Sequence, residues 1–292
     1  MAEPLISENS AMQEKSPADP APKLELPVHE AHFRAKCFQV ADRWVNRLVN
    51  LAKAMHKGFW LGCLNADDLN ALTANRYTAS KEFTSRQHFE SGLSDWELPV
   101  VERYFRNGSR ILVAAAGTGR EVLALRKAGF NAEGFECNPT LLKMGQEFFA
   151  ALGHSNPVFF CLPNNVPPGL AEYGGLIVGW GGYTHIPTRV RRIAFVRALR
   201  GRALADAPLM LSFLTRDERS RYDRLSYRVA RLIGALFRRA QEPPEPGDDL
   251  ELSDFTHRFT RAELESELHS AGFRLLHFSE QGQLGVAVGV AE

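Results

Sequence analysis

Apolar positions divide the 292-residue chain into an N-terminal part with a helical period and a longer part in which short apolar runs alternate with helices. From about residue 29 to 57, large side chains, among them Leu48 and Leu51, recur every three or four positions, which predicts an amphipathic helix that packs through this face. A shorter helix is expected after Asn65, a good N-cap residue. A further helix is expected near Ser94-Asp95-Trp96-Glu97, which has the form of a capping box. We therefore expect a disordered, Pro- and Ser-rich tail at residues 1–28 and a helical cap at residues 29–107.

From residue 108 onward, short continuous apolar runs predict strands that are buried on both faces. Strands are expected near residues 111–115, 130–135, 158–161, 175–179 and 209–214, with helices between them. This alternation predicts a parallel sheet covered by helices on both faces. A capping box at Thr260-Arg261-Ala262-Glu263 opens one more helix. Two last strands, near 273–278 and 284–290, are joined by so short a turn that they must be antiparallel.

The stretch from Ile111 to Glu136 carries the most specific signal in the chain. It predicts a buried strand, a Gly117-Thr118-Gly119 turn, a helix, and a second strand that ends on Glu136. The glycines permit positive φ angles and a close approach of the backbone to a ligand. Helix N-terminal amides and a carboxylate at the end of the second strand are the groups that bind a nucleoside. A dinucleotide pattern needs a third glycine where this chain has Val122, so binding of a pyrophosphate is not predicted.

This stretch resembles motif I of the class I S-adenosylmethionine-dependent methyltransferases, an acid-x-G-x-G-x-G pattern followed by an acid on the second strand. The three glycine positions correspond to Ala115, Gly117 and Gly119, and the ribose-binding acid corresponds to Glu136. The chain departs from the motif at Val113, where the opening acid stands, and at Ala115. The order of strands and the C-terminal hairpin extend the resemblance from about residue 108 to the end. It implies a Rossmann-like, doubly wound, mostly parallel seven-stranded α/β sheet with an antiparallel C-terminal hairpin.

The resemblance also implies S-adenosylmethionine as cofactor and an in-line transfer of its methyl group to a small-molecule acceptor. Besides the motif positions, it points to cofactor contacts at Ala116 in the turn, Cys137 after the second strand, Asn164 after the third strand, Trp180 after the fourth strand, and Tyr77 in the segment before the core. Asn164 also suits a left-handed turn without any ligand, and a buried cysteine is commonly structural. Both alternatives stay open.

The loop after the fourth strand is expected to face the methyl acceptor. The resemblance points to Tyr183 and His185 as catalytic residues, since both could orient the acceptor and an imidazole exchanges protons near neutral pH. The alternative is that His185 caps the next helix or packs against Pro187. The Arg-rich helix expected at residues 217–240 lies within an insertion, 215–250, that we interpret as a lid over the acceptor site. Peripheral contact with an anionic membrane through this helix is the less favoured alternative.

Composition narrows the remaining possibilities. The net charge of +1 gives no argument for a nucleic-acid partner, and the four cysteines are scattered without a C-x-x-C pair, so neither a metal site nor a disulfide scaffold is expected. No apolar stretch is long enough to span a membrane, and a cytoplasmic enzyme is expected. The acceptor and the oligomeric state do not follow from the sequence. Two other functions remain open: a nicotinamide-dependent oxidoreductase, and a catalytically degenerate Rossmann-like binding protein.

Overall fold

The computed structural model describes residues 33–169, 172–237, 242–251 and 254–292. The tail expected at residues 1–28 lies outside the described residues. The chain divides into two compact units, Met1–Asn46 and Arg47–Glu292. Helix α1 (Phe33–Cys63) crosses the boundary between them, and all of the features below belong to the second unit. None of the described helices is long and apolar enough to span a bilayer.

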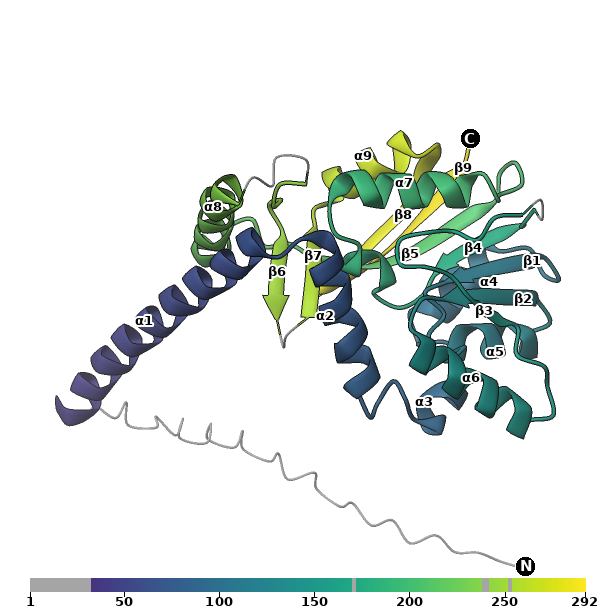
Figure 1. Cartoon of the computed structure of the whole chain (residues 1–292), viewed down its shortest axis with the longest axis horizontal. Helices are drawn as coiled ribbons and strands as arrows, with labels where there is room; N and C mark the ends of the chain where they lie inside the picture. Colours follow the sequence, from purple (N-terminus) through teal and green to yellow (C-terminus); the bar gives the residue numbers. More distant parts are fainter. Residues whose placement is uncertain (1–32, 170–171, 238–241, 252–253) are drawn as a thin grey trace, which may run out of the picture. The chain divides into compact units, whose positions relative to one another are not determined.

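Five parallel strands form the centre of the sheet in the order β3-β2-β1-β4-β5 (Figure 1). They are β1 (Arg110–Ala114), β2 (Asn131–Glu136), β3 (Val158–Phe160), β4 (Gly175–Val178) and β5 (Pro208–Thr215). β9 (Leu284–Ala291) pairs antiparallel with β5, and β8 (Phe273–Gln281) pairs antiparallel with β9. The mostly parallel seven-stranded sheet and its C-terminal hairpin are thus confirmed. The strand order reverses between β1 and β4, which is where open sheets of this kind bind ligands.

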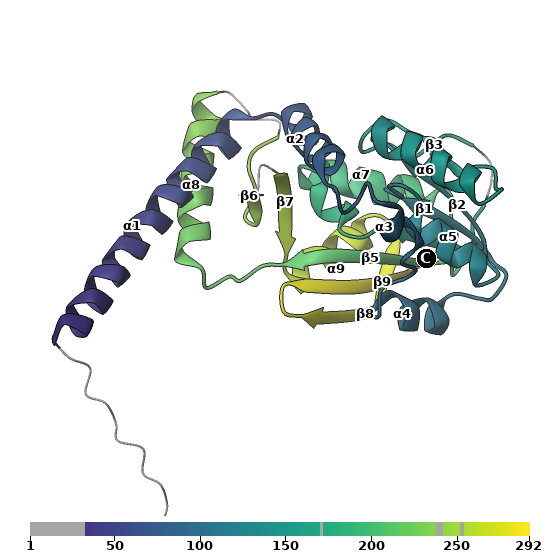
Figure 2. The ribbon, with the colours of Figure 1, turned by 90° about the horizontal axis from the view of Figure 1, so that it is seen from below.

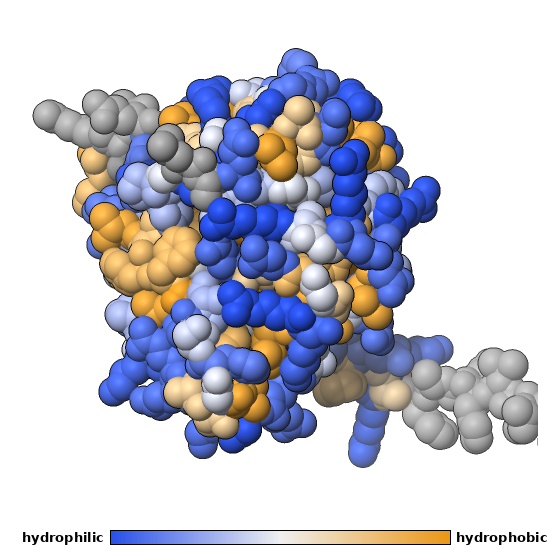
Figure 3. Space-filling model, turned by 90° about the vertical axis from the view of Figure 1, so that its right-hand side faces the viewer, coloured by the Kyte–Doolittle hydropathy of each residue, from blue (hydrophilic) through white to orange (hydrophobic). Residues whose placement is uncertain are grey.

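Helices cover both faces of this sheet (Figures 1 and 2). The helices α4 (Glu97–Tyr104), α5 (Arg120–Lys127) and α6 (Pro139–Ala151) share one apolar cluster with Ile111 and Val113 of β1. The helices α7 (Arg189–Arg200) and α9 (Arg261–Ser270) share the other cluster with Leu112 and Ala114. Alternate residues of one strand therefore enter opposite layers, as the pleat of a strand requires. Figure 3 shows a mainly hydrophilic outer face with separate apolar patches.

The structure adds two strands that the sequence analysis did not predict. β6 (Asp248–Glu251) and β7 (Asp254–Phe259) form an antiparallel hairpin, and β7 also pairs with the end of β5. The hairpin begins within the insertion expected at residues 215–250 and continues to the helix that Thr260 caps. The Arg-rich helix is present as α8 (Arg221–Leu236), and residues 238–240 of its expected range lie outside the described residues. No described residue of α8 lines either of the two cavities described below.

Three further helices lie between α1 and the first strand, in the region where a helical cap is expected. They are α2 (Ala66–Ala79), α3 (Arg86–Glu90) and α4. Asn65 caps α2 in a full capping box, which confirms that prediction. The capping box expected at Ser94 forms only in part: Glu97 Oε2 accepts from the Ser94 amide at 2.6 Å, but α4 begins at Glu97, and its N-cap residue Trp96 makes no side-chain cap. The later start places Pro99 in the first turn, where its missing N–H leaves no intrahelical bond unmade.

Glycines bring the second half of α1 close to α8. A Cβ added at Gly58 would lie 2.4 Å from the carbonyl oxygen of Ser226, and one added at Gly62 would lie 2.6 Å from Cβ of Ile233. The face of α1 that is buried here comprises Ala54, Gly58, Leu61 and Gly62. The sequence analysis placed Leu48 and Leu51 on the packed face, yet both are exposed. The helical period was predicted correctly, but close backbone contact selects the small residues for packing.

Candidate functional site

The turn between β1 and α5 holds the backbone in left-handed conformations at the carboxyl edge of the sheet. The φ angles of Ala115, Gly117 and Gly119 are 51°, 56° and 99°. A Cβ added at Gly117 would meet nothing within 4 Å, whereas one at Gly119 would lie 2.7 Å from the ring of Phe149. Gly117 therefore leaves open space beside the turn. Gly119 is needed for the close packing of α6 and lines no described cavity.

Two departures from the motif have simple structural consequences. Val113, at the position of the opening acid, is fully buried in the apolar core. Val122, at the position of a third glycine, is buried as well. A Cβ added at Gly134 on β2 would lie 3.0 Å from Cγ2 of Val122. The close approach of helix and sheet is thus achieved by a glycine on the strand instead of one on the helix.

Glu136 lies at the end of β2, where its carboxylate accepts three backbone hydrogen bonds. Oε2 accepts from the amide of Gly117 at 2.8 Å, and Oε1 accepts from the amides of Cys137 and Asn138 at 2.9 and 2.7 Å. Burial raises the pKa of Glu136, and these hydrogen bonds oppose that shift. The carboxylate thereby ties the end of β2 to the glycine turn.

Glu136 faces a cavity of about 170 Å³, here called the Glu136 cavity. Its lining includes eight of the predicted site residues: Tyr77, Ala115, Gly117, Glu136, Cys137, Asn164, Trp180 and His185. A smaller pocket of about 70 Å³ shares several of these residues and reaches Ala116 and Glu121. Asn164 has a positive φ of 59° and also donates to Asn70 Oδ1 at 3.3 Å. The left-handed turn and the position at the cavity, which the sequence left as alternatives, thus occur together.

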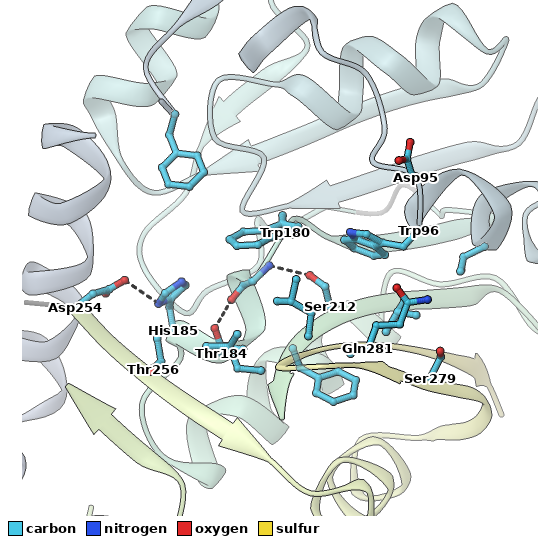
Figure 4. Close-up of a pocket in the computed structure, with 18 of the residues that line it drawn as sticks. Asp95, Trp96, Trp180, Thr184, His185, Ser212, Asp254, Thr256, Ser279 and Gln281 are labelled. Carbon is cyan, nitrogen blue, oxygen red and sulfur yellow. Dashed lines mark hydrogen bonds and ion pairs between the residues drawn. The ribbon is translucent and has the colours of Figure 1, made fainter. Parts of the chain in front are cut away.

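A second cavity of about 520 Å³, here called the Asp254 cavity, adjoins the first. Tyr77, Trp180 and His185 line both cavities and form the wall between them. In Figure 4, Asp254, His185 and Thr256 lie together at one end, with Trp180 in the middle and Trp96, Ser279 and Gln281 toward the other end. The β6–β7 hairpin supplies Glu251, Asp254 and Thr256 to this lining. A polar end and an apolar aromatic wall are the features of a small-molecule site.

His185 and Tyr77 are hydrogen-bonded to each other at the shared wall. His185 Nδ1 lies 2.8 Å from the carbonyl oxygen of Phe255, and Nε2 lies 2.9 Å from the Tyr77 hydroxyl. Since a carbonyl only accepts, the proton of neutral His185 is assigned to Nδ1, and the Tyr77 hydroxyl donates to Nε2. Burial raises the pKa of Tyr77, and the nearby Asp254 adds to this shift. Tyr77 therefore remains a neutral phenol with its proton directed at the imidazole.

Tyr183 is not brought into either cavity. It is fully buried, its ring stacks on Phe259, and its hydroxyl donates to Glu267 Oε2 at 2.6 Å. Glu267 also holds Arg192 at 2.7 Å, and Arg192 in turn reaches Glu245 at 2.8 Å. Tyr183 thus belongs to a buried network that joins α7, α9 and the segment before the hairpin. We no longer assign it to the acceptor.

A second buried network, which the sequence analysis missed, lies beside the glycine turn. Arg120 forms ion pairs with Glu97 at 2.9 Å and with Glu121 at 2.7 Å. Oε1 of Glu121 also accepts from the amide of Trp180 at 3.3 Å. Burial raises the pKa of Glu97, and the neighbouring Glu121 adds to this effect. The available sequence signal was the pair of charges Arg120-Glu121 directly after Gly119, at the start of a helix that packs on the core. Charges buried there need partners, so the pair pointed to an ionic network.

The comparison with solved structures finds methyltransferases. A SAM-dependent methyltransferase from Methanosarcina mazei is 17% identical, with 68% of this chain and 98% of that chain covered, at a TM-score of 0.53. The CcbJ methyltransferase from Streptomyces caelestis is 14% identical, with 77% and 98% covered, at a TM-score of 0.52. A SAM-dependent methyltransferase from Aquifex aeolicus is 16% identical, with 73% and 96% covered, at a TM-score of 0.50.

Comparisons with protein-family models and with curated proteins find no match. At these low identities the structural similarity establishes the fold. The chain therefore has the Rossmann-like fold of the class I SAM-dependent methyltransferases.

Proposed function

We propose that this protein transfers a methyl group from S-adenosylmethionine to a small-molecule acceptor. The observation that carries the proposal is the Glu136 carboxylate, which faces a cavity beside the open glycine Gly117 at the point where the strand order reverses. The fold is that of enzymes with this chemistry. The adjoining Asp254 cavity offers room for a second molecule across a wall made by three side chains.

The residues of the Glu136 cavity fit a nucleoside. The Glu136 carboxylate is held in place by three backbone amides and faces the cavity, where it accepts from a ribose hydroxyl. Asn164 offers its side-chain amide to the edge of the adenine ring, and Trp180 and Tyr77 form an aromatic wall of the cavity. When bound, the cofactor supplies a methyl group activated on a sulfonium. We assign Glu121 to the methionine amino group of the cofactor. The motif has an acid at the position of Val113, and Glu121 brings a carboxylate to the small pocket in its place.

His185 is the proposed base, and it acts through Tyr77. The lone pair of His185 Nε2 accepts a hydrogen bond from the Tyr77 hydroxyl, so Nε2 cannot take a proton from the acceptor directly. A proton from the acceptor therefore passes to the Tyr77 oxygen while the Tyr77 proton passes to His185 Nε2. The Asp254 carboxylate, 3.6 Å from Nδ1, stabilises the imidazolium that results. Trp180 separates the two cavities and helps to keep water from the reacting atoms.

Calorimetric titration with S-adenosylhomocysteine, S-adenosylmethionine and NADH tests the proposal. We expect the two sulfur nucleosides to bind and NADH not to bind. The substitution Glu136→Gln should weaken both about tenfold or more, the loss expected for a hydrogen bond to a charged group. Glu133→Gln is the matched control, because Glu133 lies on the same strand but is paired with Arg110 and Tyr173 away from the cavity.

Two outcomes would contradict the proposal. Binding of NADH alone would support a nicotinamide-dependent oxidoreductase. Binding of none of the three ligands, with thermal unfolding showing a folded protein, would favour a degenerate binding protein.

A further inference from the structure

The inserted β6–β7 hairpin presents one polar face to the Asp254 cavity. Side chains alternate along a strand, so Asp254 and Thr256 share one face of β7 while Phe255 and His257 share the other. Phe255 and His257 are buried away from this cavity, and both Asp254 and Thr256 line it. The hairpin therefore builds the polar end of the cavity seen in Figure 4.

Two oxygen atoms on this face lack a hydrogen-bond donor among the described residues. Thr256 is 8% exposed, and its hydroxyl is buried without a partner. Oδ1 of Asp254 accepts from the Thr73 hydroxyl at 2.8 Å, but Oδ2 has only His185 Nδ1 at 3.6 Å. That nitrogen already donates to the Phe255 carbonyl. Buried polar groups are normally paired, so two unpaired oxygens at a cavity mark the place of a ligand's donors.

The charges around the cavity favour a cation. Its described lining contains the carboxylates Glu82, Asp95, Glu251 and Asp254, against Arg76 as its single arginine or lysine. Glu251 is already paired with Arg258 at 2.9 Å. No described arginine or lysine lies within ion-pair distance of Asp254, whose side chain is 13% exposed. A carboxylate held in that environment gains most from a ligand that brings its own positive charge.

The rest of the cavity is apolar and aromatic. Trp96, Trp180 and Phe213 line it beyond the polar end. Trp180 lies between Asp254 and Trp96 in Figure 4. A complementary ligand thus carries a cation at one end and a flat apolar body behind it.

We propose that the methyl acceptor is a small arylalkyl amine, anchored by its ammonium group. The ammonium donates hydrogen bonds to Asp254 Oδ2 and Thr256 Oγ1, and the ring lies along Trp180 toward Trp96. The role of this amine as methyl acceptor rests on the proposed function, whereas the amine-binding site rests on the cavity alone. The proposal concerns the anchoring group, and carboxylate ligands of the same shape are rejected by the charge of Asp254.

Matched probes test this proposal on the full-length protein. Phenethylamine, 2-phenylethanol and phenylacetate share a ring and a chain length but differ in charge, and tryptamine with indole-3-acetate forms a larger pair. Each is titrated with and without S-adenosylhomocysteine. We expect the amines to bind at least about tenfold more tightly than the alcohol, as for one charge-assisted hydrogen bond, and the acids not to bind. Equal or tighter binding of the acids, or binding of neither amine, would overturn the proposal.

Four variants locate the site. Asp254→Asn should abolish the preference for amine over alcohol while leaving the affinity for S-adenosylhomocysteine unchanged. Thr256→Val should weaken amine binding without lowering the unfolding midpoint, because it removes an unpaired buried hydroxyl. Thr256→Ser keeps the hydroxyl and should bind as the wild type. Asp249→Asn is the matched control on the same hairpin, because Asp249 pairs with Lys57 and does not line the cavity, and it should leave the amine preference unchanged.

The outcomes separate the two proposals. Loss of stability in Thr256→Val with unchanged amine affinity would show a purely structural role and overturn the amine site. Unchanged amine preference in Asp254→Asn would overturn it as well. Amine binding in a protein that does not bind S-adenosylhomocysteine would leave the amine site standing and remove the proposed function.

Discussion

Ala115 has a strained backbone conformation at the edge of the Glu136 cavity. Its φ of 51° lies in the left-handed region, which costs an L-residue about 1–2 kcal/mol. Gly182 accommodates its methyl group: a Cβ added there would lie 2.8 Å from Cβ of Ala115. The two positions are complementary, since a side chain at one requires a glycine at the other.

Ala115→Gly should therefore raise the free energy of unfolding by about 0.5–1 kcal/mol, because relief of the left-handed strain exceeds the added flexibility of glycine in the unfolded chain. Urea unfolding measures the change. Ala114→Gly is the control, since Ala114 is the adjacent alanine, lies buried in β1 and has no positive φ. That variant should lose stability. A loss at position 115 as large as that at 114 would contradict the interpretation of Ala115 as strained.

For Tyr183 and His185, the local sequence does not determine the direction in which each side chain points. Both lie in one short 3₁₀ turn, Gly182–His185. The sequence identified the loop but could not distinguish the side chain that faces the cavity from the one that faces the core. That choice depends on Glu267, the partner of the Tyr183 hydroxyl 84 positions later, and on Phe255, whose carbonyl accepts from His185. Long-range partners of this kind leave no trace in a motif.

At the scale of elements, the sequence predicted what local interactions determine. The caps at Asn65 and Thr260 formed as expected, because each cap bonds amides within three residues. The β6–β7 hairpin was missed because Asp248, Asp249, Glu251 and Asp254 are poor strand formers. Its strands are stabilised by pairing and by distant charges, such as Lys57 at 2.6 Å from Asp249. The candidate acceptor wall was therefore the least predictable part of the site.

The contact between α1 and α8 gives a prediction for a pair of elements. Gly62→Ala should gain about 1 kcal/mol in helix propensity, but its Cβ would lie 2.6 Å from Cβ of Ile233 and 2.8 Å from the Ala230 carbonyl oxygen. Overpacking costs typically about 1–3 kcal/mol and involves backbone here, so we expect a net loss of stability. Urea unfolding measures it. Gly201→Ala, whose added Cβ has no atom closer than 3.4 Å, is the control and should not destabilise. A stabilised Gly62→Ala would mean that the helices separate readily.

Across the second unit, burial raises the pKa values of several groups that release protons at high pH. Burial raises the pKa of Cys137 to about 12. It also raises the pKa values of Tyr77, Tyr173 and Tyr183 above their ordinary value of 10.0. Tyr77 and Cys137 line the Glu136 cavity, whereas Tyr183 lies in the core. The folded protein should therefore keep protons that the unfolded chain releases.

The free energy of unfolding should accordingly be fully retained below about pH 9, the ordinary pKa of a thiol being 9.0, and fall as the pH rises from there toward 12. In that range the unfolded chain binds fewer protons than the folded one, so the slope of stability against pH is negative. Urea unfolding between pH 8 and 11 measures it. Cys137→Ser removes one of these groups and should make the slope shallower by up to one proton, whereas Cys37→Ser, at an exposed cysteine, should leave it unchanged. A flat profile, or an identical slope in Cys137→Ser, would mean that water already reaches Cys137. The Glu136 cavity would then be open enough to lose the protection from solvent on which the proposed methyl transfer depends.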